Sequence, residues 1–247
     1  MTDDKIKKWL DEDLDIQTKE EHVRKSYDKK IVAWLDILGI RNAIKNEKKY
    51  DAESIIDIMS KLASYVSAAC DKYLAENKLH YIQIADGFMI AADLSLADQI
   101  CSIIAEIQWK VLVNLRMLSR GAITAGNVSV YGSGNLIIGP AYVDAYAMES
   151  ENAIYARVIL SDAFLKETKG QLTFAFAKED ADKMIYIDYI HYIMDTQKYD
   201  SKRMEKLLVE QGVYKEIKNS YETLALSVKQ KHGWTMALFE RNKISHK

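Results

Sequence analysis

The chain has 247 residues, 49% of them hydrophobic, and its 34 basic and 36 acidic side chains leave a formal net charge of −2. This balance excludes a global field that would draw the protein to nucleic acid or to an anionic membrane, so neither partner is expected. Cys70 and Cys101 lack metal-ligand spacing and are too few for a disulfide framework, which fits a reducing compartment. No segment approaches the roughly 18 apolar residues of a membrane span. We expect a globular cytoplasmic protein.

Hydrophobic periodicity predicts alternating strands and helices. A short, nearly continuous apolar run is typical of a strand buried on both faces, whereas apolar residues at three- and four-residue spacing indicate a helix packed on a sheet. The dipeptide Asp86-Gly87 is a hairpin signal, and Pro140 suits the first turn of a helix. The expected elements are a strand in 31–40, a helix in 51–76, hairpin strands in 79–85 and 87–92, a helix in about 95–117, a strand from 120 that enters a hairpin at 132–134, a helix from 140 to about 150, and a strand in 156–162.

This order predicts an α+β fold with a ferredoxin-like βαββαβ core and helices covering one face of the sheet. Residues 1–29 are charged and loosely periodic, so we expect a helical N-terminal extension there. The core is assigned to a catalytic domain at 30–177, and residues 178–247 to a C-terminal extension packed on the same domain. The elements expected in this extension are a strand in 184–193 and helices in about 201–229 and 233–242.

Two aspartates stand out within this pattern. Asp36 interrupts the first apolar strand, and Asp86 begins the hairpin turn. Each has a purely structural interpretation, because Asp36 would cap the next helix and Asp86 would only shape the turn. In a βαββαβ sheet, however, the first strand and the hairpin are neighbours, and an apolar strand tolerates a carboxylate only with compensation. Hard oxygen ligands suit Mg²⁺ or Mn²⁺ shared with phosphates, so the pair predicts a metal site that the carbonyl of Ile37 would complete.

The residues that follow Asp36 predict a phosphate contact. The backbone amides of Leu38, Gly39 and Ile40 begin a helix, where free N–H groups and the dipole favour an anion, and Gly39 permits close approach. Arg120 precedes a glycine at a strand start and would reach the triphosphate or the base. Arg157 lies in a later strand and is a second candidate for the same contact. The alternative for both arginines is a solvated side chain at a strand end.

Four stretches carry a resemblance to a known family, and a fifth at 229–243, KQKHGWTMALFERNK, is weaker. The four are AWLDILGI at 33–40, IADGFMIA at 84–91, SRGAITAGN at 119–127 and GPAYVDAYAMES at 139–150. Together they resemble the class III nucleotidyl cyclases, and more specifically the shorter bacterial cyclases of the Pycsar antiphage defence type. The resemblance implies a homodimer that converts a nucleoside triphosphate into a 3′,5′-cyclic monophosphate and pyrophosphate.

The same resemblance implies roles for individual residues and for partners. Asp36 and Asp86 would bind two Mn²⁺ or Mg²⁺ ions, one acidifying the ribose 3′-hydroxyl and the other neutralising the triphosphate. Apart from the resemblance, we expect Arg120 to act in catalysis, and it is our candidate for a residue that reaches across the dimer interface. In the Pycsar type the product is a cyclic pyrimidine nucleotide that activates a separate effector protein. The hairpin at 127–139 would serve as the dimerisation arm, covering a sheet face that bears apolar residues.

Three positions depart from the purine-specific cyclases. Val143 and Ala147 stand where those enzymes have an asparagine and, four residues later, an arginine, and Ile82 replaces a base-reading lysine. Neither Val143 nor Ala147 can orient ribose or stabilise developing charge. We therefore predict a cyclase that acts on UTP or CTP. Two alternatives stay open, namely an inactive nucleotide-binding regulatory module and a dimeric interaction protein that binds no nucleotide.

Overall fold

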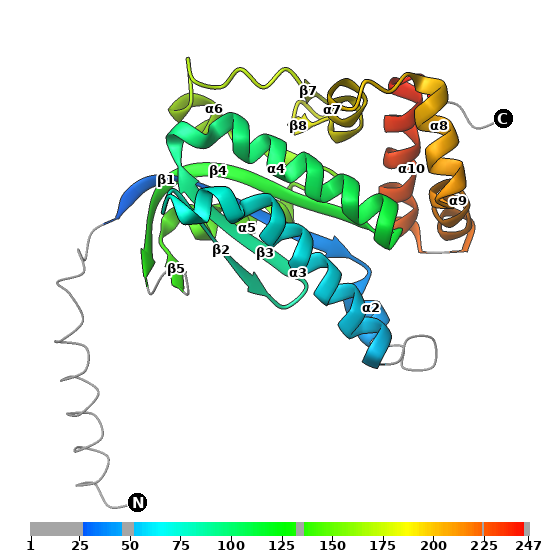
Figure 1. Cartoon of the computed structure of the whole chain (residues 1–247), viewed down its shortest axis with the longest axis horizontal. Helices are drawn as coiled ribbons and strands as arrows, with labels where there is room; N and C mark the ends of the chain where they lie inside the picture. The colour runs from blue at the N-terminus through cyan, green and yellow to red at the C-terminus, as the bar shows by residue number, and fades with distance from the viewer. Residues whose placement is uncertain (1–26, 46–51, 132–135, 224, 245–247) are drawn as a thin grey trace, which may run out of the picture.

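A computed structural model describes residues 27–45, 52–131, 136–223 and 225–244 of the chain (Figure 1). The strands are β1 (Asp28–Leu38), β2 (Leu79–Ile84), β3 (Gly87–Asp93), β4 (Leu118–Tyr131), β5 (Leu136–Ile138), β6 (Val158–Leu160), β7 (Ala177–Glu179) and β8 (Ile185–Ile187). They form a sheet in the order β2-β3-β1-β4-β6-β8-β7, and β5 pairs with β4 off this path. The expected βαββαβ core is confirmed, and β1 lies between β3 of the hairpin and β4.

Helices cover both faces of this sheet. The α-helices are α2 (Ile40–Lys45), α3 (Ala52–Ala75), α4 (Ala97–Lys110), α5 (Pro140–Glu151), α6 (Asp162–Glu167), α7 (Tyr189–Thr196), α8 (Ser201–Glu210), α9 (Val213–Thr223) and α10 (Leu226–Arg241). Figure 1 shows α3 and α4 lying across one face and α5 behind the sheet. No helix in the described ranges is long and apolar enough to cross a membrane.

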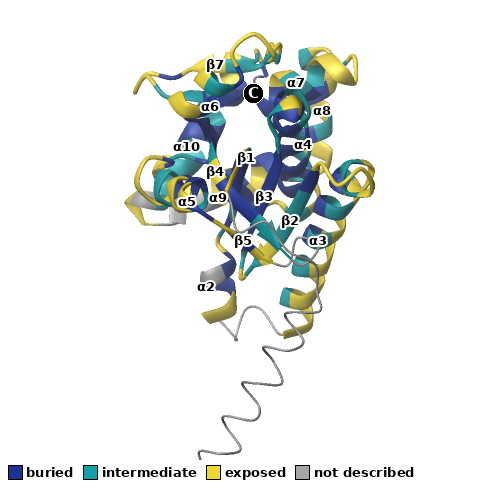
Figure 2. Ribbon diagram, turned by 90° about the vertical axis from the view of Figure 1, so that its left-hand side faces the viewer, coloured by how far each residue is buried: buried dark blue, intermediate teal, exposed yellow. Residues whose placement is uncertain are grey.

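Strand β1 is buried on both sides, as its continuous apolar run predicts. Its alternate residues belong to two hydrophobic clusters, because successive side chains point to opposite faces. Leu35 packs in the main core with α3 and α4, whereas Trp34 packs in a smaller cluster with Ala141 and Ala145 of α5. The central strands are accordingly dark blue in Figure 2. The expectation that helices cover a single face is therefore corrected, because α5 covers part of the second.

Several element boundaries differ from the sequence prediction. β1 begins at Asp28, two residues inside the expected N-terminal extension, while residues 1–26 and the hairpin tip at 132–134 lie outside the described residues. The helix expected over 95–117 is interrupted. It comprises α4, then a π-helical turn, Val111–Leu115, which Arg116 ends with a left-handed φ of 55°. Such a π-helical turn accommodates one extra residue in a helix.

The C-terminal extension differs most. The strand expected over 184–193 is only three residues long, because Asp188 accepts a hydrogen bond from the His191 amide and caps α7. The long helix expected from 201 ends at α8, and Gly212, with a φ of +71°, separates it from α9. β7 and β8 extend the sheet beyond β6, so the extension contributes strands as well as helices.

Candidate functional site

The central three strands bring the predicted metal residues to one end of the sheet. In the antiparallel register, Asp36 of β1 lies opposite Gly87 of β3 on one side and Arg120 of β4 on the other. The turn of the β2–β3 hairpin closes over this end, and the Ile37 amide donates to the Asp86 carbonyl at 3.3 Å. Residues from three separate sequence segments therefore meet around the end of β1.

Glycines allow the strands to approach closely beside Asp36. A Cβ at Gly121 would lie 2.2 Å from the Trp34 carbonyl oxygen, and a Cβ at Gly87 would lie 2.9 Å from the Leu35 carbonyl oxygen. Both oxygens belong to the backbone of β1, which cannot move without shifting Asp36. Each glycine directly follows a candidate site residue, Arg120 or Asp86, so the RG and DG dipeptides have a steric basis.

Arg120 joins two carboxylates. Its Nε lies 2.6 Å from Glu149 Oε1 and 3.5 Å from Asp36 Oδ2, and its Nη1 donates to the Ala153 carbonyl at 3.4 Å. The shorter contact is an ion pair by distance, but the Nε–H does not point at Glu149 Oε1 with hydrogen-bond geometry. The longer contact, from Arg120 Nε to Asp36 Oδ2, does have hydrogen-bond geometry. Arg120 is thus shared between the two acids.

Glu149 is a buried member of the site that the sequence analysis missed. Its side chain is 5% exposed, and burial raises its pKa to about 7, an increase that Arg120 opposes and Asp36 reinforces. Glu149 follows Ala141 and Ala145 at four-residue spacing on the buried face of α5. A carboxylate on that face needs a cationic partner, and this periodicity was the available sequence signal.

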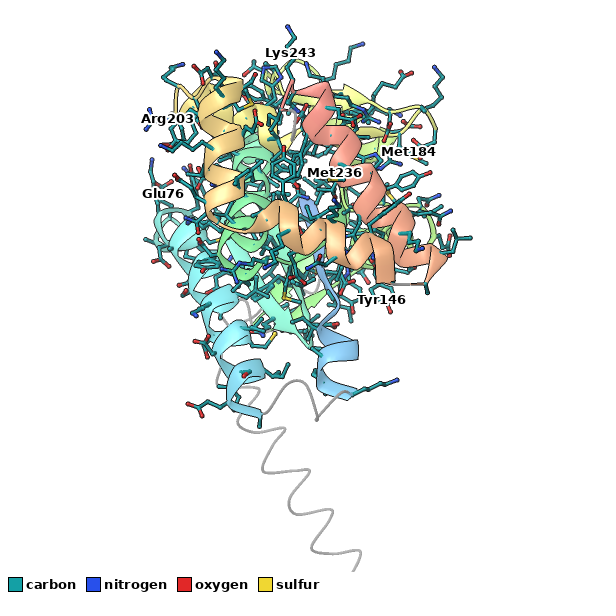
Figure 3. The ribbon with its side chains drawn as sticks, turned by 90° about the vertical axis from the view of Figure 1, so that its right-hand side faces the viewer. Glu76, Tyr146, Met184, Arg203, Met236 and Lys243 are labelled. Atoms are coloured by element: carbon teal, nitrogen blue, oxygen red, sulfur yellow. The ribbon has the colours of Figure 1, made fainter. Side chains whose placement is uncertain are left out.

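Lys231 of α10 adds a second cation to the site. Burial lowers the pKa of Lys231 and Arg120 lowers it further, whereas Asp36 and Glu149 raise it. These interactions put the lysine within electrostatic range of all three groups. Figure 3 views the protein from the side on which α10 lies, with Met236 of the same helix labelled. Lys231 was also missed, because its place depends on how the C-terminal extension packs.

The segment expected to bind phosphate turns directly out of β1. Gly39 is exposed with a φ of +103°, which favours glycine, and Ile40 is buried at the start of α2. Leu38 is half-buried at the end of β1. Helix α2 has only six described residues, so its dipole is smaller than that of a long helix. The proposed phosphate contact of these three amides stays a prediction.

Arg157, the other arginine expected to contact substrate, is buried in an ion-pair cluster. Its side chain has no exposed surface, and its two terminal nitrogens contact Asp180 and Asp182. The guanidinium lies 5.0 Å from the Tyr155 ring centroid and 5.9 Å from that of Trp234. Buried charges are tolerated when they are paired in this way. Arg157 is therefore a buried ion-pair residue in this structure, and its expected contact with substrate stays a prediction.

The candidate metal ligands form a small set. In the described part of the chain, no group of three or more His, Cys, Asp or Glu residues is placed to hold a metal ion. Asp36 and Asp86, with the Ile37 carbonyl, offer two carboxylates and one neutral oxygen. This donor set suits a divalent ion that also binds substrate phosphates, because Mg²⁺ uses one or two carboxylates in such sites. The residues fit a substrate-shared ion rather than a site built by protein ligands alone.

Comparison with known proteins gives matches only among solved structures. No protein-family model matches the chain, and no curated protein matches it. A bacterial light-regulated adenylyl cyclase is 15% identical over 74% of this chain, with a TM-score of 0.50, and the match spans 61% of that protein's length.

Two further matches have lower TM-scores. The adenylyl cyclase CyaB from P. aeruginosa is 19% identical over 66% of this chain and 93% of that one, with a TM-score of 0.46. A dimeric guanylyl cyclase domain of the RhoGC fusion protein from the aquatic fungus Blastocladiella emersonii is 15% identical over 66% and 97%, with a TM-score of 0.48. The chain has the mixed α and β fold of class III cyclase catalytic domains.

Proposed function

We propose that the protein is a nucleotidyl cyclase that converts a nucleoside triphosphate into a 3′,5′-cyclic nucleotide and pyrophosphate. The observation that carries this proposal is the register that gathers Asp36, the Asp86 turn and Arg120 at one end of a cyclase-type sheet. In this reaction the ribose 3′-oxygen bonds to the α-phosphorus, and the bond from that phosphorus to the β-phosphate oxygen breaks. Negative charge builds up on the departing pyrophosphate.

The chain's own groups suit this charge distribution. Asp36, Asp86 and the Ile37 carbonyl would hold Mn²⁺ or Mg²⁺. We propose that each site binds two of these ions. When bound, such ions neutralise the triphosphate and lower the pKa of the 3′-hydroxyl. Arg120 would stabilise the charge on the leaving group, because its guanidinium already lies beside Asp36. The amides of 38–40 would bind phosphate.

We further propose UTP or CTP as the substrate. Support comes from α5, where Val143 is 58% exposed and Ala147 is half-buried, so neither supplies the polar groups that purine cyclases use there. Ile82 is half-buried in β2 and offers no hydrogen bond to a purine. The cyclic pyrimidine product would act as a second messenger in antiphage defence and would activate a separate effector protein.

A homodimer is part of the proposal. Four apolar side chains between 49% and 58% exposed lie on β5 and α5, namely Leu136, Ile138, Val143 and Tyr146. We propose that a second copy of the chain covers them. Arg120 does not need to reach across this interface, as the sequence analysis had expected, because it contacts Asp36 of its own chain.

One incubation tests the activity. Purified protein is mixed with ATP, GTP, UTP or CTP and Mn²⁺, and the products are identified by mass spectrometry, with Asp36→Asn as the negative control. We expect cyclic UMP or cyclic CMP from the wild type and none from the variant. A cyclic purine product would correct the substrate assignment, and no product from any triphosphate would overturn the cyclase proposal.

A second candidate is an inactive regulatory module that binds nucleotide. The observation in its favour is that Val143 and Ala147 lack the polar groups of active purine cyclases. Titration calorimetry with each triphosphate separates the two candidates. Metal-dependent binding without any cyclic product would favour the regulatory module.

A further inference from the structure

Glu149 and Asp36 compete for one guanidinium. Arg120 Nε lies 2.6 Å from Glu149 and 3.5 Å from Asp36, so the guanidinium is closer to the acid that is not a proposed metal ligand. The Ala153 carbonyl accepts from Nη1 at 3.4 Å and gives the arginine an additional contact just beyond the end of α5. The guanidinium therefore has contacts on two sides, with α5 and its following residues on one and Asp36 on the other.

The helix that carries Glu149 is seated firmly on the sheet. Ala141 and Ala145 are buried against the second face, and a Cβ at Gly126 of β4 would lie 3.3 Å from the Ala141 Cβ. This close approach fixes the distance between α5 and β4. Glu149, one turn beyond Ala145, consequently reaches Arg120 from a rigid element rather than from a loop.

The position of Arg120 matters to a cation at Asp36. A close arginine–carboxylate pair is among the strongest ion pairs in proteins, and it occupies the oxygens that a metal ion would need. A guanidinium closer to Asp36 would also repel a divalent ion. A second acid that attracts the arginine weakens both effects.

We propose that Glu149 is a positioning residue that holds the Arg120 guanidinium back from Asp36, so that Asp36 can accept a divalent cation. This inference rests on the proposed function, since it takes Asp36 as a metal ligand. Glu149 touches neither the metal nor the substrate. Its influence passes entirely through Arg120.

The test measures Mn²⁺ binding directly, by titration calorimetry at pH 8 on the full chain without nucleotide, so that Glu149 is ionised. In Glu149→Gln the guanidinium is expected to pair with Asp36 alone, and the Kd for Mn²⁺ rises about tenfold, a change of about 1.4 kcal/mol. Glu151→Gln makes the same chemical change at an exposed position of the same helix and leaves the Kd unchanged. In Asp36→Ala the binding is lost, which places the bound ion at this site.

A double-mutant cycle separates positioning from a general electrostatic effect. Arg120→Gln and the double variant Arg120→Gln/Glu149→Gln are expected to bind Mn²⁺ with equal Kd, because Glu149 has nothing to position once the guanidinium is absent. A further loss of affinity in the double variant would mean that Glu149 acts through its own charge or through folding, and would overturn the inference. The double variant also removes both members of the ion pair together, so it remains informative if Glu149→Gln folds poorly.

The outcomes distinguish this inference from the proposed function. If the wild type binds no Mn²⁺ in the absence of nucleotide, the inference is overturned, and the incubation with the four triphosphates decides the proposed function separately. If Asp36→Ala binds as well as the wild type, the proposed metal centre fails and the inference fails with it. If the wild type binds through Asp36 and Glu149→Gln binds equally well, only the positioning role is overturned.

Discussion

Asp36 shows how one residue depends on its neighbours in the sheet. It is a half-buried carboxylate near the end of β1 and directly follows the five consecutive buried residues at 31–35. Arg120 lies directly opposite in the register, and Gly87 on the other side leaves room for the backbone. A cation within reach offsets the cost of keeping the carboxylate charged. The same arrangement makes Asp36 accessible enough to bind a ligand.

The first prediction concerns the two aspartates. Asp36→Ala and Asp86→Ala should each lower cyclase activity at least about 100-fold, because each change removes a ligand of one metal centre. The double variant should be scarcely less active than either single variant, as expected of groups that act as a unit. Initial rates of product formation measure this. Asp57→Ala, which alters an exposed residue on α3 paired with Lys61, serves as the control and should be fully active. Retention of a tenth of wild-type activity in either single variant would contradict the assignment.

The second prediction concerns pH. The pKa of Glu149 is raised from 4.5 to about 7, so the folded protein holds this proton more tightly than the unfolded chain. The corresponding stability is fully present below about pH 4.5 and is lost as the pH rises to about 7, by at most about 3 kcal/mol. Glu149→Gln lacks this titration. Its free energy of unfolding relative to the wild type should therefore improve between pH 5 and pH 8, as measured by denaturant titration. Parallel pH profiles would contradict the raised pKa.

At the scale of elements, replacing a glycine by alanine should change stability in opposite directions at two positions. Gly121→Ala should destabilise the protein by about 3 kcal/mol or more, because the new Cβ would collide with the backbone of β1. Gly233→Ala should stabilise it by up to about 1 kcal/mol, since Gly233 lies inside α10 and its nearest neighbour, a ring carbon of Tyr221, is 3.5 Å away. Thermal unfolding of both variants measures the difference. A neutral Gly121→Ala would show that β1 and β4 can separate.

The elements differ in how much of them the sequence could predict. β1, α3 and the β2–β3 hairpin carry long local patterns, and their predictions were confirmed within a few residues. β7 is three residues long and has no periodicity to detect. The apolar segment at 184–193 is compatible with either a strand or a helix, and only the cap at Asp188 ends the strand and begins α7.

The residues of the candidate site also differ in how far the sequence could predict them. Asp36, Asp86 and Arg120 could be chosen because each sits in a local signal, an interrupted strand, a turn or a strand start. The ion pair of Arg157 could not be predicted, because its partner Asp180 is 23 residues away in sequence and no local pattern reveals the pairing. Glu149 belongs between these cases, since its spacing from Ala145 marks a buried charge but does not identify the partner.

At the scale of the whole molecule, Asp180 joins the C-terminal helix to the sheet. It contacts Arg157 and accepts hydrogen bonds from Trp234 Nε1 at 2.6 Å and from Arg241 Nη2 at 3.1 Å. Trp234 also lies parallel to the Tyr155 ring at 6.4 Å. These contacts anchor α10 one turn beyond Lys231. The extension therefore supplies a charged group to the candidate site as well as covering the core.

The last prediction concerns assembly. If a second copy covers the exposed apolar residues of β5 and α5, then Ile138→Glu and Val143→Glu should each convert a dimer into a monomer, because a charge buried in an apolar interface is costly. Both side chains are about half exposed within one subunit, so neither change should affect folding. Sedimentation velocity measures the oligomeric state, and circular dichroism confirms the fold. Activity should fall together with the dimer fraction.

Ile56→Glu provides the matched control for these variants. Ile56 is 64% exposed on α3, a helix that covers the opposite face of the sheet, so this variant should remain dimeric and active.

Asp36 and Arg120 are in contact within one chain. Mixing Asp36→Ala subunits with Arg120→Ala subunits should therefore recover no activity, since both sites of each mixed dimer are damaged. Recovery of activity in that mixture would instead mean that the partner subunit supplies one of these residues. Full activity from a wild-type monomer would contradict the prediction that activity requires the dimer.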